Sequence, residues 1–96
     1  MADPKVTHEW FATIDADKLS AWIEKNGEAA KKRHHTDDVY FAVWMHQLNI
    51  IVRNRTFMSY DDLEDWDYWM AYDAGMSPRE AAGDMLEDLG YAGRGE

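Results

Sequence analysis

A chain of 96 residues, 46% hydrophobic and 30% charged, is long enough for one modest core and too apolar to remain disordered. The lack of cysteine excludes disulfides and thiolate metal sites and suits a reducing compartment. No apolar stretch approaches the ~20 residues that span a bilayer, and MADPKVTHEW lacks the layout of a signal peptide, so we expect a cytoplasmic protein without membrane contact.

The net charge of −9 is concentrated in the C-terminal part of the chain. Residues 1–56 carry 8 acids and 8 Lys or Arg, whereas residues 57–96 carry 11 acids against Arg79 and Arg94 alone. Such a surface repels nucleic acids and membranes and attracts cations or basic proteins.

Two helices are predicted in the first 35 residues. Thr7 is a candidate N-cap for a short helix that carries Trp10, Phe11 and Ile14. Asp15 is the N-cap signal of a second helix, which continues toward the basic run KKRHH at residues 31–35.

One face of this second helix is apolar, and it groups Leu19, Trp22, Ile23 and Asn26 at about 100° per residue. Gly27 either ends the helix or weakens it.

The segment VYFAVWMHQLNIIVRNR, residues 39–55, permits two structures. Thr36, Asp37 and Asp38 precede it as a helix-start signal, but its β-branched and aromatic residues also suit a hairpin over about residues 39–58. A helix is favoured because it groups the less apolar positions into one stripe. The members of that stripe are Asp38, Ala42, His46, Asn49 and Arg53.

Two more helices are predicted before residue 90. Ser59 with Asp62 forms a variant capping box that opens a helix through DDLEDWDYWMAYD, and Ser77-Pro78-Arg79-Glu80 opens the last one. Gly90 ends the last helix as its C′ residue. The predicted fold is all-α, a compact single-domain bundle of four to five helices over residues 1–96 with frayed ends at 1–6 and 91–96; the alternative is α+β with the hairpin.

A helical wheel divides these last two helices into an inner and an outer face. The inner positions are Leu63, Trp66, Met70, Ala74, Ala81, Ala82, Met85, Leu86 and Leu89. Gly83 predicts close packing against a neighbour. The outer positions form the candidate partner-binding face, which comprises Asp61, Glu64, Asp65, Tyr68, Tyr72, Glu80, Asp84, Glu87 and Asp88.

This acidic face predicts a protein that binds other proteins. Like charges four residues apart on a helix cost a few tenths of a kcal/mol each, so their retention suggests a use, although a merely solvated face is the plain alternative. Carboxylates four apart rise ~6 Å, a repeat comparable with the ~3.4 Å phosphate spacing of DNA. We therefore expect an inhibitor or nucleic-acid mimic that docks on the basic surface of a nucleic-acid-handling protein. A short, acidic, aromatic-rich chain resembles small inhibitors and adaptors of phages or mobile elements.

Two other functions are open. The first is a self-associating structural or adaptor protein, a homodimer in which Trp69, Tyr60 and Phe57 bury against a second copy. The second is a small ligand-binding protein or enzyme with a cleft near His46 and Arg53.

Enzymatic motifs are missing from the sequence. It contains no Gly-rich phosphate loop and no G-x-S-x-G, and the spacing of His34, His35, Asp37 and Asp38 matches no zinc helix. We expect no catalysis, no cofactor and no metal. Residues 67–90 have the helix, Gly-containing turn and second helix of a helix-turn-helix, but the acids of the second helix argue against direct nucleic-acid binding.

Overall fold

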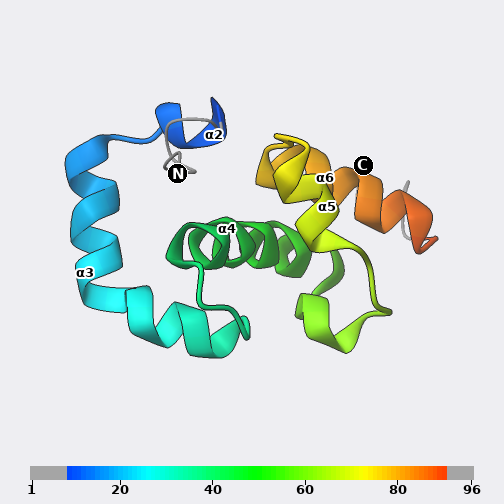
Figure 1. The fold of residues 1–96 in the computed structure, drawn as a ribbon. Coiled ribbons are helices and arrows are strands. Elements are labelled where there is room, and N and C mark those ends of the chain that lie inside the picture. The colour runs from blue at the N-terminus through cyan, green and yellow to red at the C-terminus, as the bar shows by residue number, and fades with distance from the viewer. Residues whose placement is uncertain (1–8, 91–96) are drawn as a thin grey trace.

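The helix α4 (Val39–Thr56) is the centre around which the other helices pack. The computed structural model describes residues 9–90, and α4 lies there between α3 (Ala16–Arg33) on one side and α5 (Tyr68–Asp73) and α6 (Pro78–Asp88) on the other (Figure 1). A short helix, α2 (Glu9–Ala12), precedes α3, and a 3₁₀ turn, η1 (Tyr60–Asp62), follows α4. The described chain is an all-helical compact globule, as predicted. The hairpin alternative at residues 39–58 is wrong, because residues 39–56 form one helix.

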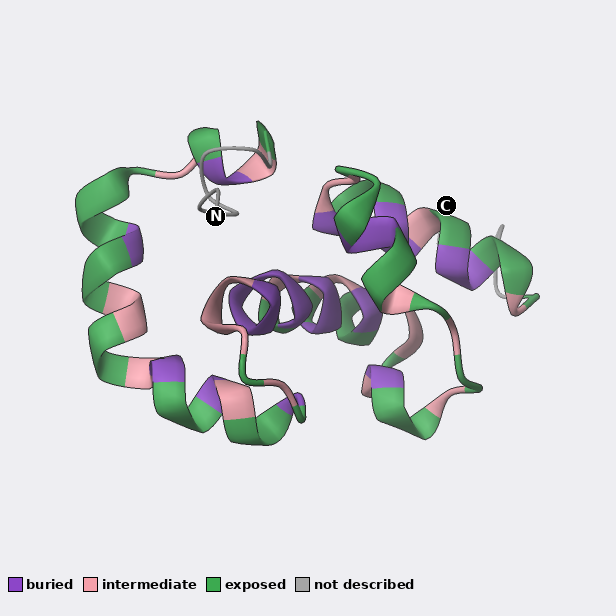
Figure 2. Cartoon of the chain, in the orientation of Figure 1, coloured by how far each residue is buried: buried purple, intermediate pink, exposed green. Residues whose placement is uncertain are grey.

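The start of α4 follows from its N-cap. The carboxylate of Asp38 accepts hydrogen bonds from the backbone nitrogens of Tyr40 and Phe41 at 3.0 and 3.1 Å. Beyond this cap the helix is buried along most of its length (Figure 2). The predicted stripe is not a single surface, because Asn49 is buried whereas His46 and Arg53 are exposed.

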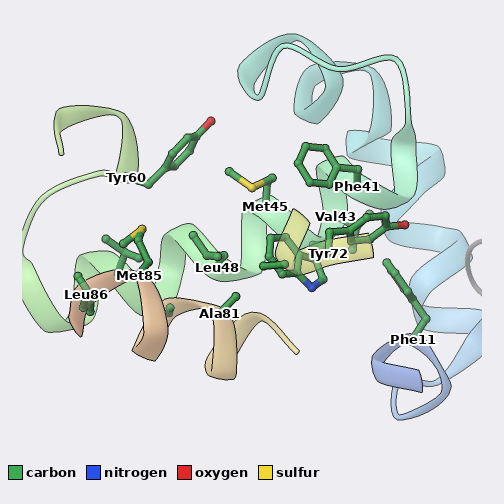
Figure 3. Close-up of a cluster of buried hydrophobic side chains, with 14 of the residues drawn as sticks. Phe11, Phe41, Val43, Met45, Leu48, Tyr60, Tyr72, Ala81, Met85 and Leu86 are labelled. Carbon is green, nitrogen blue, oxygen red and sulfur yellow. The ribbon is translucent and has the colours of Figure 1, made fainter. Parts of the chain in front are cut away.

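The core joins α4 to the C-terminal helices and to α2. Side chains of α4 such as Leu48 face Ala81 and Met85 of α6, while Phe11 of α2 lies near Tyr72 of α5 (Figure 3). Trp44, which is fully buried, satisfies its indole nitrogen by donating a hydrogen bond to the Met76 carbonyl at 2.9 Å.

The second helix begins and continues as its sequence signals indicate. Asp15 caps α3 by accepting hydrogen bonds from the backbone nitrogens of Asp17 and Lys18. The helix passes through Gly27 without ending there. Gly27 is buried where α3 meets the start of α4, and a Cβ on it would lie 3.1 Å from Cγ2 of Val39. Close approach of the two helices accounts for this glycine.

The continuous helix predicted from Ser59 onward is wrong. Ser59 makes no side-chain capping bond, and its single hydroxyl proton is instead shared between the Asp61 carboxylate and the Asn49 amide oxygen. After η1 the chain leaves the helical conformation at Leu63, and helix resumes only where the Asp67 carboxylate accepts a hydrogen bond from the Met70 nitrogen. Polar side chains that bond locally offer the backbone an alternative to helix, and here the alternative is taken.

The interruption changes which residues of α5 face the core. Ala71 and Tyr72 are buried, whereas Met70 is 65% exposed and Ala74 is also exposed, the opposite of the predicted inner face. Leu63, before α5, still packs against the core as predicted. The helical wheel assumes one unbroken helix. Because residues 63–67 are not helical, the wheel assigns the wrong residues of α5 to the core-facing side.

The last helix agrees with its prediction at both ends. Ser77 and Glu80 form the reciprocal capping box at 3.1 Å each, with Pro78 at the first position. Gly90 has a φ of +86° directly after the C-cap residue Leu89. The predicted inner residues are buried or packed against the core, namely Ala81, Ala82, Met85, Leu86 and Leu89.

Some predictions concern residues that the structure does not describe. The capping role of Thr7 and the frayed ends at 1–6 and 91–96 lie outside residues 9–90. Within that range, no helix combines the length and apolar character required to cross a membrane.

Gly83 provides a test of helix packing, because its predicted close contact is not found. A Cβ there would meet only a guanidinium nitrogen of Arg55, at 3.8 Å. We expect Gly83→Ala to raise the free energy of unfolding by about 1 kcal/mol, since alanine removes the backbone-entropy cost of glycine. Urea denaturation measures this. Gly27→Ala is the matched control and should gain less, because its methyl group crowds Val39; a larger gain at Gly27 would contradict this account.

Candidate functional site

Ten exposed acids lie on the C-terminal part of the described chain, and we call five of them the acidic surface: Glu64, Asp65, Asp84, Glu87 and Asp88. Trp66 places the segment after η1 beside α6, because its indole nitrogen donates a hydrogen bond to Asp88 at 2.9 Å. Asp84 and Asp88 are one helical turn apart and share a face of α6. The structure thus gathers five of the nine predicted residues from two elements.

Asp61, a predicted member of the face, is already neutralised within the molecule. Its carboxylate pairs with Arg33 at 2.9 Å and accepts a hydrogen bond from the Ser59 hydroxyl. The Ser59 bond, together with the Arg33 guanidinium, lowers the pKa of Asp61 to about 2. Glu80 remains exposed, but its side chain serves the capping box of α6.

The two predicted tyrosines do not project as surface anchors. Tyr72 is buried, with its ring 5.1 Å from that of Phe41 and 5.6 Å from that of Trp44. Its assignment to the outer face is therefore wrong, for the reason of helix phase given above. Tyr68 is half-buried edge-on to Tyr60 at 5.3 Å, and burial raises the pKa of Tyr68 to about 12.

The residues proposed for self-association differ in exposure and in position. Tyr60 is buried, so it is not part of an exposed patch. Trp69 is 51% exposed and lies edge-on to Phe41 at 5.0 Å, while Phe57 is 92% exposed. Trp69 lies near the N-terminal end of α4 and Phe57 lies at its C-cap. They do not form one patch.

A polar cluster that the sequence did not reveal joins α3, α4 and η1. The Asn49 amide oxygen accepts hydrogen bonds from the Tyr60 nitrogen at 2.8 Å and the Ser59 hydroxyl at 3.2 Å. The Tyr60 hydroxyl lies 2.9 Å from Nδ1 of His34, and the Arg33 guanidinium lies over the Tyr60 ring. Partners 10 to 28 positions apart leave no periodic signal in a sequence.

His34 is the most perturbed histidine of this cluster. Burial of the ring, aided by the positive charge of Arg33, lowers the pKa of His34 to about 4, so the imidazole is neutral at pH 7. Its Nδ1 faces Tyr60, but its buried Nε2 has no hydrogen-bond partner among residues 9–90. Buried polar atoms without partners are uncommon in folded proteins.

The cleft expected near His46 exists as two adjoining hollows between α3 and α4. Trp22 and His46, whose ring centroids are 4.9 Å apart, line both hollows. The larger hollow, about 390 Å³, is mainly apolar and includes Trp10, Leu19 and Val43 in its walls. The smaller, about 170 Å³, is lined by Trp22, Asn26, Ala29, Ala30, Arg33, His34 and His46.

Arg53 takes no part in either hollow. It lines a separate depression of about 320 Å³ with Ile50, Asn54 and Phe57 at the C-terminal end of α4. Nowhere in residues 9–90 do three or more His, Asp or Glu side chains come together as a group able to hold a metal ion.

Comparison with known proteins adds no assignment: no family model, curated protein or solved structure matches this chain. Its function is inferred from its own residues.

The buried state of His34 predicts a pH dependence of stability. An unfolded chain protonates His34 near pH 6.5, whereas the fold does so only near pH 4, so the unfolded state binds more protons between these values. Stability is therefore highest above about pH 6.5 and falls as the pH drops toward 4. In urea unfolding measured from pH 4 to 7.5, we expect the free energy of unfolding of His34→Gln to fall less steeply with decreasing pH than that of the wild type.

The control for this measurement is Asp61→Asn. The carboxylate of Asp61 has a lowered pKa, so its stabilising contribution is lost only as the pH falls from 3.8 toward 2. Asp61→Asn should therefore leave the slope between pH 4 and 6.5 intact. Identical slopes in the wild type and in His34→Gln would show that another group is responsible.

Proposed function

We propose that this chain is a small protein-binding module whose acidic surface docks on the basic surface of a nucleic-acid-handling protein and inhibits it. One observation carries the proposal: apart from Asp61, the acids of this region have no counterion within the described chain. Residues 57–90 hold ten acids against Arg79, and Asp61 is the one acid among them that forms an ion pair within the described chain. Arg55 lies against Gly83 yet forms no ion pair with Asp84 or Glu87.

The mechanism of this inhibition is electrostatic and steric. Uncompensated carboxylates steer a cationic surface toward the module and raise the association rate, an effect that salt screens. On α6, Glu80, Asp84 and Asp88 repeat every ~6 Å along the axis. A ladder of this kind competes for side chains that otherwise contact phosphates. The proposed setting is a cytoplasm, which a chain without cysteine suits.

The decisive experiment reverses charge on the acidic surface. A partner is first identified by affinity capture with cross-linking from the source cell, then purified for kinetic measurements. We expect the double variant Asp65→Lys, Asp84→Lys to lower the association rate at least tenfold at low salt, with a smaller effect at high salt. The matched control is Glu24→Lys, Asp37→Lys, which changes the net charge equally at exposed positions on and after α3.

The two double variants separate local from general electrostatics. If the control variant associates with the partner at the wild-type rate while the Asp65→Lys, Asp84→Lys variant associates more slowly, the acidic surface is supported as the contact. Equal losses in both variants would mean that net charge alone matters, and unchanged binding in both would remove the acidic surface from the mechanism.

Self-association is a second candidate, and Phe57 favours it. Phe57 follows α4 with a φ of +63°, in the left-handed region that costs an L-residue roughly 1–2 kcal/mol, and it is 92% exposed. Glycine is the usual residue at such a helix end. An aromatic side chain kept there in water suggests an anchor for a second copy, beside exposed Ile50 and the depression that both residues line.

Phe57→Gly separates folding from association. We expect the variant to raise the free energy of unfolding of the monomer by about 1 kcal/mol, because glycine accepts the left-handed conformation without strain. The same change should abolish dimers in analytical ultracentrifugation. Met70→Ala, which removes another exposed apolar side chain, is the control and should dimerise normally. A wild-type protein that stays monomeric at all concentrations excludes this candidate.

A further inference from the structure

The smaller hollow between α3 and α4 contains hydrogen-bonding groups that the fold does not use. His34, one of its lining residues, is only 7% exposed, and its Nε2 has no partner among the described residues. The side-chain amide of Asn26, on the same wall, makes no hydrogen bond to another described residue. The two terminal nitrogens of Arg33 donate hydrogen bonds to Asp61 and Ser59, whereas its Nε–H donates none to a described residue.

The hydrogen bond to Tyr60 decides the character of the unused His34 nitrogen. His34 Nδ1 and the Tyr60 hydroxyl are 2.9 Å apart, and we assign the hydroxyl as the donor, because a phenol is a better proton donor than a neutral imidazole and an imidazole nitrogen is the better acceptor. The proton of neutral His34 therefore resides on Nε2, which is left as a donor. Because the two nitrogens lie on different sides of the ring, the bond to Tyr60 turns Nε2 away from η1.

We propose that this hollow binds a small aromatic carboxylate. Its lining residues Asn26, Arg33 and His34 each carry an unused N–H donor, that of His34 being buried behind the wall, and no Asp or Glu lines the hollow. Trp22 supplies an aromatic wall against which a flat ring packs. The volume of about 170 Å³ limits the ligand to one or two fused rings.

His46 forms the exposed wall of this site. Its side chain is exposed, and its ring lies 6.5 Å from that of His34 and 4.9 Å from that of Trp22. Because Nε2 of His34 is shielded from solvent, this binding requires the His46 ring to turn aside before a carboxylate reaches that nitrogen. The ligand ring then takes the place of His46 against Trp22. This site lies apart from the acidic surface, and it does not depend on the proposed docking function.

The test uses the intact protein with benzoate and indole-3-carboxylate as probes, with benzamide and benzylamine as neutral and cationic counterparts. Calorimetric titration should give saturable binding of a carboxylate with a Kd of about 1 mM or tighter, as expected of a ligand of this size. Benzamide should bind at least tenfold more weakly, and benzylamine should not bind. Chemical-shift changes in NMR spectra should centre on Asn26, His34 and Trp22.

Asn26→Asp is the sharpest variant, because it is isosteric and breaks no internal hydrogen bond, yet places a negative charge in the hollow. It should weaken carboxylate binding at least tenfold. Asn54→Asp adds the same charge on the exposed part of α4 and should leave binding unchanged. His34→Gln removes the donor and should weaken binding as well, with folding checked by circular dichroism.

Three results would overturn the proposal. They are the absence of saturable binding by both carboxylates at 10-fold the expected Kd, equal affinity for benzamide and benzoate, and equal affinity in Asn26→Asp and Asn54→Asp. The two proposals can be tested separately. If the Asp65→Lys, Asp84→Lys variant loses partner docking but still binds benzoate, the hollow is independent of the acidic surface.

Discussion

The buried amide of Asn49 is the constraint on which the C-terminal half of the structure depends. A buried polar group must find partners, and Asn49 obtains them from the backbone of Tyr60 and the hydroxyl of Ser59. This bonding fixes the 3₁₀ turn η1 to α4, three residues after α4 ends. It thereby sets Tyr60 against His34, so that the end of α3, the middle of α4 and the turn form one connected unit.

The 3₁₀ turn η1 and the break after it also decide which side of α5 faces the core, and therefore which aromatic residues the core contains. Because helix resumes only at Asp67, Tyr72 meets Phe41 and Trp44, and Met70 is left in solvent. The core accordingly uses tyrosine where a continuous helix would have used methionine and alanine. The predicted acidic face thereby loses Tyr72 as an exposed aromatic residue.

The two proposed sites follow from different physical properties of the chain. The proposed role of the acidic surface depends on charge that the chain does not neutralise, and binding of that kind is long-range and sensitive to salt. The hollow between α3 and α4 depends on donors that the fold leaves unused beside Trp22, and it acts at contact distance. Arg33 links the regions, because its pairing with Asp61 neutralises one of the predicted acids while Arg33 also lines the hollow.

Local signals in the sequence determined the helices wherever a cap and a periodic pattern agreed. Asp15, Asp38 and the Ser77–Glu80 box begin helices as predicted, and the inner face of α6 is correct, because these effects act within a few residues. The concentration of uncompensated charge after residue 57 could also be predicted from the sequence. Four features could not be predicted: the break at residues 63–67, the burial of Tyr72, the neutralisation of Asp61 and the unpartnered nitrogen of His34. Each depends on a contact between residues 10 or more positions apart, and tertiary packing alone decides which of these form.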